Sequence, residues 1–369
     1  MKVAVLGLAA LVGCSSTTTT APDGGGNADQ GVSKPVSTTT IFVAVEDQGQ
    51  VAAVEASSGK LLGKASLQYT SQDGHPVGVL VHNVQGAPDG KLVWATGNMN
   101  HGGGGHTGHE NEPDQLVGID PTTYAVKKRI PLGVMAHLAH VVLGNGKAYV
   151  TATEANVVFE VDLAAGSILR KLALPAKTGP HGARLTPDGK QLVVAGMTDG
   201  SIQLVDLADG KVTTVDVDGI AVQAAVLPDG SAAFVTLFDK KQVARLDLKT
   251  RELKTFDLPS GAVGPLQLYP TADSKQLWVA DQGVLNGAPT GDSLYRLNAT
   301  TGAVELTAKV GKGPHGVVVE EHGSRVWITN MVDSTLQSVD ATSGKVLSTV
   351  EVGPNPNGVT CLHPTGAMP

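Results

Sequence analysis

The chain has 369 residues, of which 46 are Gly, 20 are Pro and only 17% are charged. No apolar run in its body approaches the ~20 residues that a helix needs to cross a bilayer, so the composition indicates a turn-rich β protein without a membrane-spanning helix. The net charge of −7 argues against a nucleic-acid partner, because affinity for a phosphate backbone comes from Lys and Arg.

The N-terminus has the pattern of a secretory signal peptide over residues 1–13: Lys2, an apolar stretch, and small residues that run into Cys14. The sequence LVGC at residues 11–14 resembles the bacterial lipobox, which implies cleavage before Cys14 and lipid on its thiol. Several acyl chains would anchor the protein firmly, since each buried CH₂ contributes ~0.8 kcal/mol. Ser15 in place of Asp implies, by resemblance to Gram-negative lipoproteins, the outer membrane, on its periplasmic or surface face. An ordinary cleaved signal with an incidental Cys14 is the alternative.

Residues 14–40 are Ser, Thr, Gly, Asp and Pro with almost nothing apolar to bury, so we expect a lipidated, disordered tether. With Cys14 lipidated, Cys361 is the only remaining thiol and no intrachain disulfide can form. Cys361 is then expected to be a small buried hydrophobe. The folded domain is predicted to span residues 41–369.

One unit recurs from Ile41 onward, at intervals of about 41 to 56 residues, and consists of four short strands joined by polar turns. Its second strand is rich in β-branched and aromatic residues in seven copies: IFVAVE at Ile41, LVWAT at Leu92, AYVTA at Ala148, LVVAG at Leu192, AFVTL at Ala233, LWVAD at Leu277 and VWITN at Val326. The aromatic residues of this strand are predicted to form a core layer between repeats: Phe42, Trp94, Tyr149, Phe234, Trp278 and Trp327.

The third strand of each unit ends in a polar residue before a small turn: Glu55, Asp120, Asp162, Asp206, Asp247, Asn298 and Asp340. A side-chain acceptor that opens a turn can bind backbone N–H groups two residues on, so these acids are predicted to be structural rather than catalytic. The other hairpin carries PDG at Pro88, Pro187 and Pro228, where Gly supplies a positive φ.

Seven such units predict an all-β, seven-bladed β-propeller. Two of them, KAYVTATEANVVFEVDLAAGSILRKLAL and SRVWITNMVDSTLQSVDATSGKVLSTVEVG, resemble the YVTN family of propeller repeats. The resemblance covers nearly all of residues 41–369 and implies fold rather than function. The chain starts on a second strand and ends on a first, so residues 358–363 should complete the blade that Ile41 begins.

The blade phase places several histidines on one face, at the start of the innermost strands: His82, His137 with His140, His181 and His315. The long insertion NMNHGGGGHTGHENEPDQ lies in a link on the same face and adds His101, His106 and His109. Imidazoles spaced by flexible glycines can converge on one ion, and imidazole with carboxylate suits copper or zinc. The alternative is that PHG is a structural blade-entry sequence and that the insertion is a solvated loop. His322 and His363 are expected on the opposite face, away from any site.

Three functions remain open for this propeller. The first is a monomeric, lipid-anchored binding scaffold whose channel mouth takes a small ligand or an envelope protein. The second is a copper- or zinc-binding protein, with redox activity as an open option, because the outline is similar to the propellers of nitrous oxide reductase and cytochrome cd1 nitrite reductase. This chain has no CxxCH haem site, no cupredoxin-like domain and only part of the histidine ring. The third is a lactonase-like hydrolase, although the sequence has no GxSxG motif. The sequence assigns no catalytic residue, so enzymatic activity stays open.

Lipidation can be tested with Cys14→Ser. Without the thiol no lipid can be attached, so this variant should move from the detergent phase to the aqueous phase in a detergent partition, or stay uncleaved. Unchanged partitioning into detergent would contradict the lipoprotein prediction.

Overall fold

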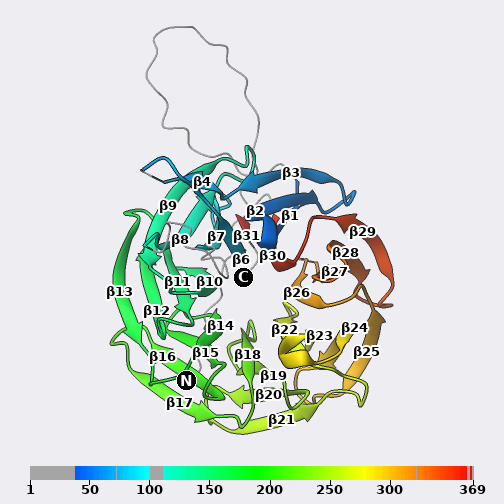
Figure 1. Cartoon of the computed structure of the whole chain (residues 1–369). Coiled ribbons are helices and arrows are strands. Elements are labelled where there is room, and N and C mark those ends of the chain that lie inside the picture. The colour runs from blue at the N-terminus through cyan, green and yellow to red at the C-terminus, as the bar shows by residue number, and fades with distance from the viewer. Residues whose placement is uncertain (1–37, 72, 100–110, 321, 364–365, 368–369) are drawn as a thin grey trace, which may run out of the picture. The chain divides into compact units, whose positions relative to one another are not determined.

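The computed structural model of the chain describes residues 38–71, 73–99, 111–320, 322–363 and 366–367. The predicted signal peptide and nearly all of the predicted tether lie outside the described residues. The described chain forms seven antiparallel sheets of four or five strands, which Figure 1 shows arranged as blades around a central axis, and one additional two-stranded sheet. The seven-bladed β-propeller predicted from the repeats is therefore confirmed. Within the described residues, no helix is long and apolar enough to cross a membrane.

Each of six blades consists of four consecutive strands from the axis outward, whereas the remaining blade joins β30 to β1, β2 and β3 and adds the two-residue strand β31 beside β30. We number the blades from this one, which contains both ends of the domain. The innermost strands of blades 1 to 7 are β30 (Pro356–His363), β6 (Val79–Gly86), β10 (Leu138–Gly144), β14 (Pro180–Leu185), β18 (Ala221–Val226), β22 (Pro265–Pro270) and β26 (Pro314–Val319). The second strands are β1 (Thr40–Val45), β7 (Val93–Met99), β11 (Lys147–Ala152), β15 (Gln191–Gly196), β19 (Ala232–Leu237), β23 (Gln276–Gly283) and β27 (Arg325–Asn330).

The third strands are β2 (Gln50–Glu55), β8 (Asp114–Ile119), β12 (Val157–Asp162), β16 (Ser201–Asp206), β20 (Gln242–Asp247), β24 (Thr290–Asn298) and β28 (Thr335–Asp340). The outermost strands are β3 (Leu61–Ser66), β9 (Val126–Gly133), β13 (Ser167–Ala173), β17 (Val212–Asp216), β21 (Leu253–Asp257), β25 (Val304–Lys309) and β29 (Val346–Glu351). Short additional elements are β4 (Tyr69–Thr70), β5 (Pro76–Val77), β31 (Gly366–Ala367) and the 3-10 turns η1 (Glu46–Gln48) and η2 (Leu285–Gly287).

The ring closes through its own ends, as predicted. β30 pairs antiparallel with β1, with Cys361 opposite Ile41 and Leu362 opposite Thr40. In Figure 1 the red β30 lies beside the blue β1. Cys361 is buried in the core of this blade, as predicted.

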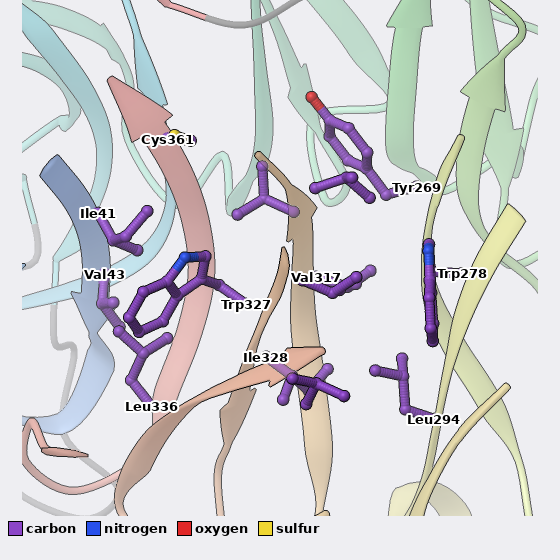
Figure 2. Packing of buried hydrophobic residues seen from close by; sticks show 14 of the residues in the cluster. Ile41, Val43, Tyr269, Trp278, Leu294, Val317, Trp327, Ile328, Leu336 and Cys361 are labelled. Carbon is purple, nitrogen blue, oxygen red and sulfur yellow. The ribbon is translucent and has the colours of Figure 1, made fainter. Parts of the chain in front are cut away.

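Aromatic side chains of the second strands fill the space between blades. All six predicted residues are at most 2% exposed. Figure 2 shows two such interfaces: Trp327 of blade 7 faces Ile41 and Val43 of blade 1, and Trp278 of blade 6 faces Val317 of blade 7. Burial of these large apolar surfaces is the main favourable term that holds neighbouring blades together.

The turn acids are structural acceptors, as the repeats predicted. Six of them accept backbone N–H groups two or three residues on, at 2.8–3.2 Å: Asp120, Asp162, Asp206, Asp247, Asn298 and Asp340. Glu55 differs, because its longer side chain accepts from the Ser58 hydroxyl instead. The glycines of the three PDG turns have φ of +69°, +68° and +72°, so these turns need a residue without Cβ.

A buried threonine of the second strand fixes the start of the innermost strand. There the innermost strand shifts register against its neighbour, between Ala221 and Ala224 in blade 5 for example, which is a β-bulge. The hydroxyl of Thr236 accepts from the Gln223 N–H at 3.1 Å and donates to the Leu266 carbonyl of blade 6 at 2.7 Å. Thr151 and Thr329 make the same two bonds, so one hydroxyl ties a bulge to the next blade.

Removing the closing strand should destabilise the whole ring. Deletion of residues 357–369 leaves β1 with an exposed edge and uncovers the core of blade 1, so the melting temperature should fall and aggregation should rise. The control is deletion of residues 366–369, which leaves β30 intact and should have a small effect. A protein without residues 357–369 that melts at the parent temperature would disprove closure by β30.

The threonine bridge predicts a cost for Thr236→Val, which keeps the shape but leaves the Gln223 N–H and the Leu266 carbonyl buried without a partner. Urea unfolding should show a loss of about 1–3 kcal/mol. Thr213→Val on exposed β17 is the matched control and should be close to neutral. Equal midpoints for the two variants would show that the bridge contributes nothing.

Candidate functional site

The bulges set out two positions per blade at the start of the innermost strand, on the side that we call the mouth face. The first position carries His82, Ala139, His181, Val222, Leu266, His315 and Asn357, and the second carries Asn83, His140, Gly182, Gln223, Gln267, Gly316 and Gly358. In the PHG blades, the second position packs against the backbone of the next blade. A Cβ at Gly316 would collide with the Asn357 carbonyl, which explains why glycine follows histidine there.

Three imidazoles gather on the mouth face. The ring of His82 lies 5.8 Å from that of His137 and 5.5 Å from that of His181, between ring centroids, and the His82–His181 pair is edge to face. These residues come from three successive blades. The blade phase read from the sequence therefore placed them on one face correctly, and the structure adds that they are neighbours.

Glu46 is the carboxylate of this group, and sequence reasoning missed it. It begins η1, in the link between β1 and β2, and its Oε1 lies 3.4 Å from His82 Nδ1. Asn357 Nδ2 donates to Glu46 Oε2 at 2.8 Å and lies 3.1 Å from the same His82 nitrogen. Burial disfavours the carboxylate anion, but hydrogen bonds from His82 and Asn357 and the His82 charge outweigh it, so the pKa of Glu46 falls to about 2. Glu46 is the last residue of IFVAVE, just as Asp281 is the last residue of LWVAD, and an acid at the end of a second strand was the signal that could have identified it.

His181 and His315 are held in one tautomer. His181 Nδ1 lies 3.1 Å from the Val222 carbonyl oxygen, which can only accept, so the ring proton resides on Nδ1 and Nε2 carries the lone pair. His315 Nδ1 donates in the same way to Gln282 Oε1 at 2.8 Å, and its Nε2 is buried without a hydrogen-bond partner within the described chain. Burial, reinforced by the nearby His82, lowers the pKa of each imidazole to about 3, so both are neutral near pH 7.

His137 has an unusual backbone for its place in the cluster. Its φ is +52°, a left-handed conformation that costs energy for a residue with a side chain. Asp114 holds it there, because Oδ2 accepts from the N–H groups of Ala136 at 2.8 Å and His137 at 2.9 Å. Asp114 Oδ1 accepts from the Met99 N–H at 2.8 Å. Desolvation and the charge of His82 lower the pKa of His137, although the residue as a whole is exposed.

His140 does not join the three rings, because a one-residue bulge moves it to the second position of its blade. It is 3% exposed, and its Nε2 lies 3.1 Å from Gln223 Nε2, which also donates to Gln267 Oε1 at 2.7 Å. Burial, together with the charge of Arg184, lowers the pKa of His140 well below its usual value. It is therefore one member of a buried amide row beneath the mouth face.

The other sequence candidates separate into three groups. His101, His106 and His109 lie outside the described residues. His322 is exposed in the β26–β27 turn and His363 ends β30, both on the far face. Asp281 accepts from the Val263 and Gly264 N–H groups and from the Tyr295 hydroxyl, so it braces a loop. Across residues 38–71, 73–99, 111–320, 322–363 and 366–367, no group of three His, Cys, Asp or Glu side chains is close enough to hold a metal ion.

The arrangement offers neutral nitrogen lone pairs and one ionised carboxylate on a single face. Neutral imidazoles with fixed tautomers can coordinate a transition metal, and they can also accept hydrogen bonds from a polar ligand. Glu46 beside His82 is in addition an acid–base pair. Within the described residues, no Lys or Arg side chain is hydrogen-bonded or ion-paired to these groups.

Comparison with known proteins identifies the fold. The sequence matches no protein-family profile and no curated protein. Among solved structures, the chain is similar to a periplasmic gluconolactonase of Pseudomonas aeruginosa (TM-score 0.66, 19% identity, 88% of this chain and 98% of the other). It is also similar to Kuenenia stuttgartiensis hydrazine synthase (TM-score 0.65, 14% identity, 86% and 99%) and to a protein of unknown function from Desulfotomaculum acetoxidans (TM-score 0.67, 12% identity, 88% and 99%). At these identities the likeness establishes the seven-bladed propeller fold alone.

Proposed function

We propose that this chain is an exported lipoprotein of the YVTN-repeat kind, anchored through Cys14 to the outer membrane, whose mouth face binds a copper or zinc ion. The observation that carries the metal proposal is the tautomer and protonation state of His181 and His315. Each has Nδ1 bound to an acceptor-only oxygen, Nε2 left as a lone pair, and a pKa of about 3. A metal requires this state of histidine: neutral, with a fixed tautomer and ring orientation.

The distances of the His137 and His181 rings from the His82 ring are consistent with all three binding one ion. Zn–N bonds are about 2.0–2.1 Å long, so the centroids of two imidazoles on one metal lie roughly 5–6 Å apart. The separations of His137 and His181 from His82, 5.8 and 5.5 Å, are of this size. Glu46 beside His82 Nδ1 provides the carboxylate that commonly orients a ligating histidine.

The described residue that precedes the insertion supports a contribution from its histidines. Met99 immediately precedes residues 100–110, and its N–H donates to Asp114, which also accepts from the His137 amide. His101, His106 and His109 follow Met99 in the sequence. We infer that these histidines complete the coordination that the described rings begin.

The Glu46–His82 pair supports lactone hydrolysis as a second candidate. An imidazole beside a carboxylate can act as a general base toward water. The described groups around the pair include no cation to stabilise an oxyanion, which makes this candidate weaker. A purely protein-binding scaffold would need neither the fixed tautomers nor the pair.

Metal binding is tested by titrating Zn²⁺ or Cu²⁺ into the untagged chain from Ser15 onward, by calorimetry. The double variant His181→Ala/His315→Ala should bind at least ~10-fold more weakly, the usual range for groups that support a metal site. The difference in affinity between the parent and this variant should persist at pH 5.5, because with pKa values of about 3 His181 and His315 become protonated only well below the ordinary ~6.5.

The control is His322→Ala/His363→Ala on the far face, which should bind like the parent. Equal affinity for parent and His181/His315 variant would overturn the proposal. Loss of all binding on deletion of residues 101–109 alone, with the His181/His315 variant unaffected, would place the metal in the insertion only. Hydrolysis of a gluconolactone by the metal-free parent, abolished by His82→Ala, would favour the second candidate.

A further inference from the structure

A cavity lies at the opposite end of the propeller axis from the histidines of the mouth face. It has a volume of about 310 Å³ and is formed where the innermost strands of blades 4 to 7 end. Its walls include three prolines from successive blades, one tyrosine and two charged residues: Pro187 and Pro228 of the PDG turns, Pro270 at the end of β22, Tyr269, Arg184 and Glu320. Most of this lining is apolar, which is typical of a small-molecule site with a few polar groups.

Arg184 is the unusual residue of this cavity. Its guanidinium lies 5.6 Å from the Tyr269 ring, and it has no hydrogen bond or ion pair with any described residue. Burial lowers its pKa, which means that the surroundings disfavour its charge. Four other arginines are placed differently, because each donates to a carbonyl or side-chain oxygen: Arg129, Arg170, Arg296 and Arg325.

Glu320 does not neutralise Arg184, although both line the cavity. Its Oε1 accepts from Trp327 Nε1 at 2.6 Å and lies 3.8 Å from Arg325 Nη1. The carboxylate is thus already compensated by a different cation. Arg184 is half-buried and remains without a counter-ion among the described residues, and a partly desolvated, unpaired charge costs stability in a free protein.

We propose that this cavity binds a small organic carboxylate with an apolar body. The carboxylate would pair with Arg184, whose planar guanidinium suits bidentate binding. The apolar body would pack against Tyr269 and the proline rings. This site is separate from the proposed metal site, since it lies on the far face and shares no residue with it.

Benzoate is the probe, and benzamide is its neutral counterpart of the same shape. Benzoate should bind the parent chain from Ser15 onward by calorimetry and raise its melting temperature, because a ligand that binds only the folded state stabilises it. Benzamide should bind at least ~10-fold more weakly, since the charge-assisted pair with Arg184 is absent. Failure of benzoate to bind, or equal binding of benzamide, overturns the proposal.

Arg184→Met should weaken benzoate binding at least ~10-fold and, without ligand, should melt higher than the parent, because the unpaired charge is removed. A purely structural arginine would give the opposite shift in melting temperature. Arg251→Met, at an exposed position, is the matched control and should change neither property. Arg184→Lys keeps the charge but not the planar guanidinium, so this variant should bind benzoate with intermediate affinity. Benzoate affinity like that of the parent in Arg184→Met would disprove the site. Zn²⁺ or Cu²⁺ affinity should be the same in all three variants.

Discussion

The β-bulge at the start of each innermost strand is the constraint on which the architecture of the mouth face depends. It turns one backbone N–H away from the sheet ladder, and a second-strand threonine satisfies that group in blades 2, 3, 5 and 7. Three of these hydroxyls also bind a carbonyl of the next blade, so the position of each blade entrance depends on its neighbour. The blade entrances in these blades are therefore held by hydrogen bonds between neighbouring blades.

The two ends of the axis have different electrostatics. On the mouth face, burial keeps His181 and His315 neutral, while hydrogen bonds keep Glu46 ionised. At the other end, Arg184 is half-buried and has no counter-ion among the described residues. At both ends, ionisable side chains have pKa values shifted by their surroundings. Ionisable groups with such shifts commonly mark sites of function.

The fold itself leaves the chemistry open. Propellers of this outline include a gluconolactonase and a hydrazine synthase, and the chain shares less than a fifth of its residues with either. Function must be argued from the side chains at the blade entrances. There, imidazoles with fixed tautomers favour a metal, while the Glu46–His82 pair retains an acid–base alternative.

Local sequence patterns were sufficient to predict the number of blades, the closure by the terminal strand, the aromatic layer and the role of the turn acids. Each of these follows from a local pattern repeated seven times, so strand order and register can be read without knowing which blades touch. The contacts between side chains of different blades could not be predicted in this way and are seen only in the folded ring. The tertiary structure placed Glu46 and Asn357 beside His82, the Val222 carbonyl beside His181, and His140 one position deeper than its neighbours. It also left Arg184 without a counter-ion. Such contacts depend on the ring being closed and on one-residue differences between bulges, and neither leaves a periodic signal in the sequence.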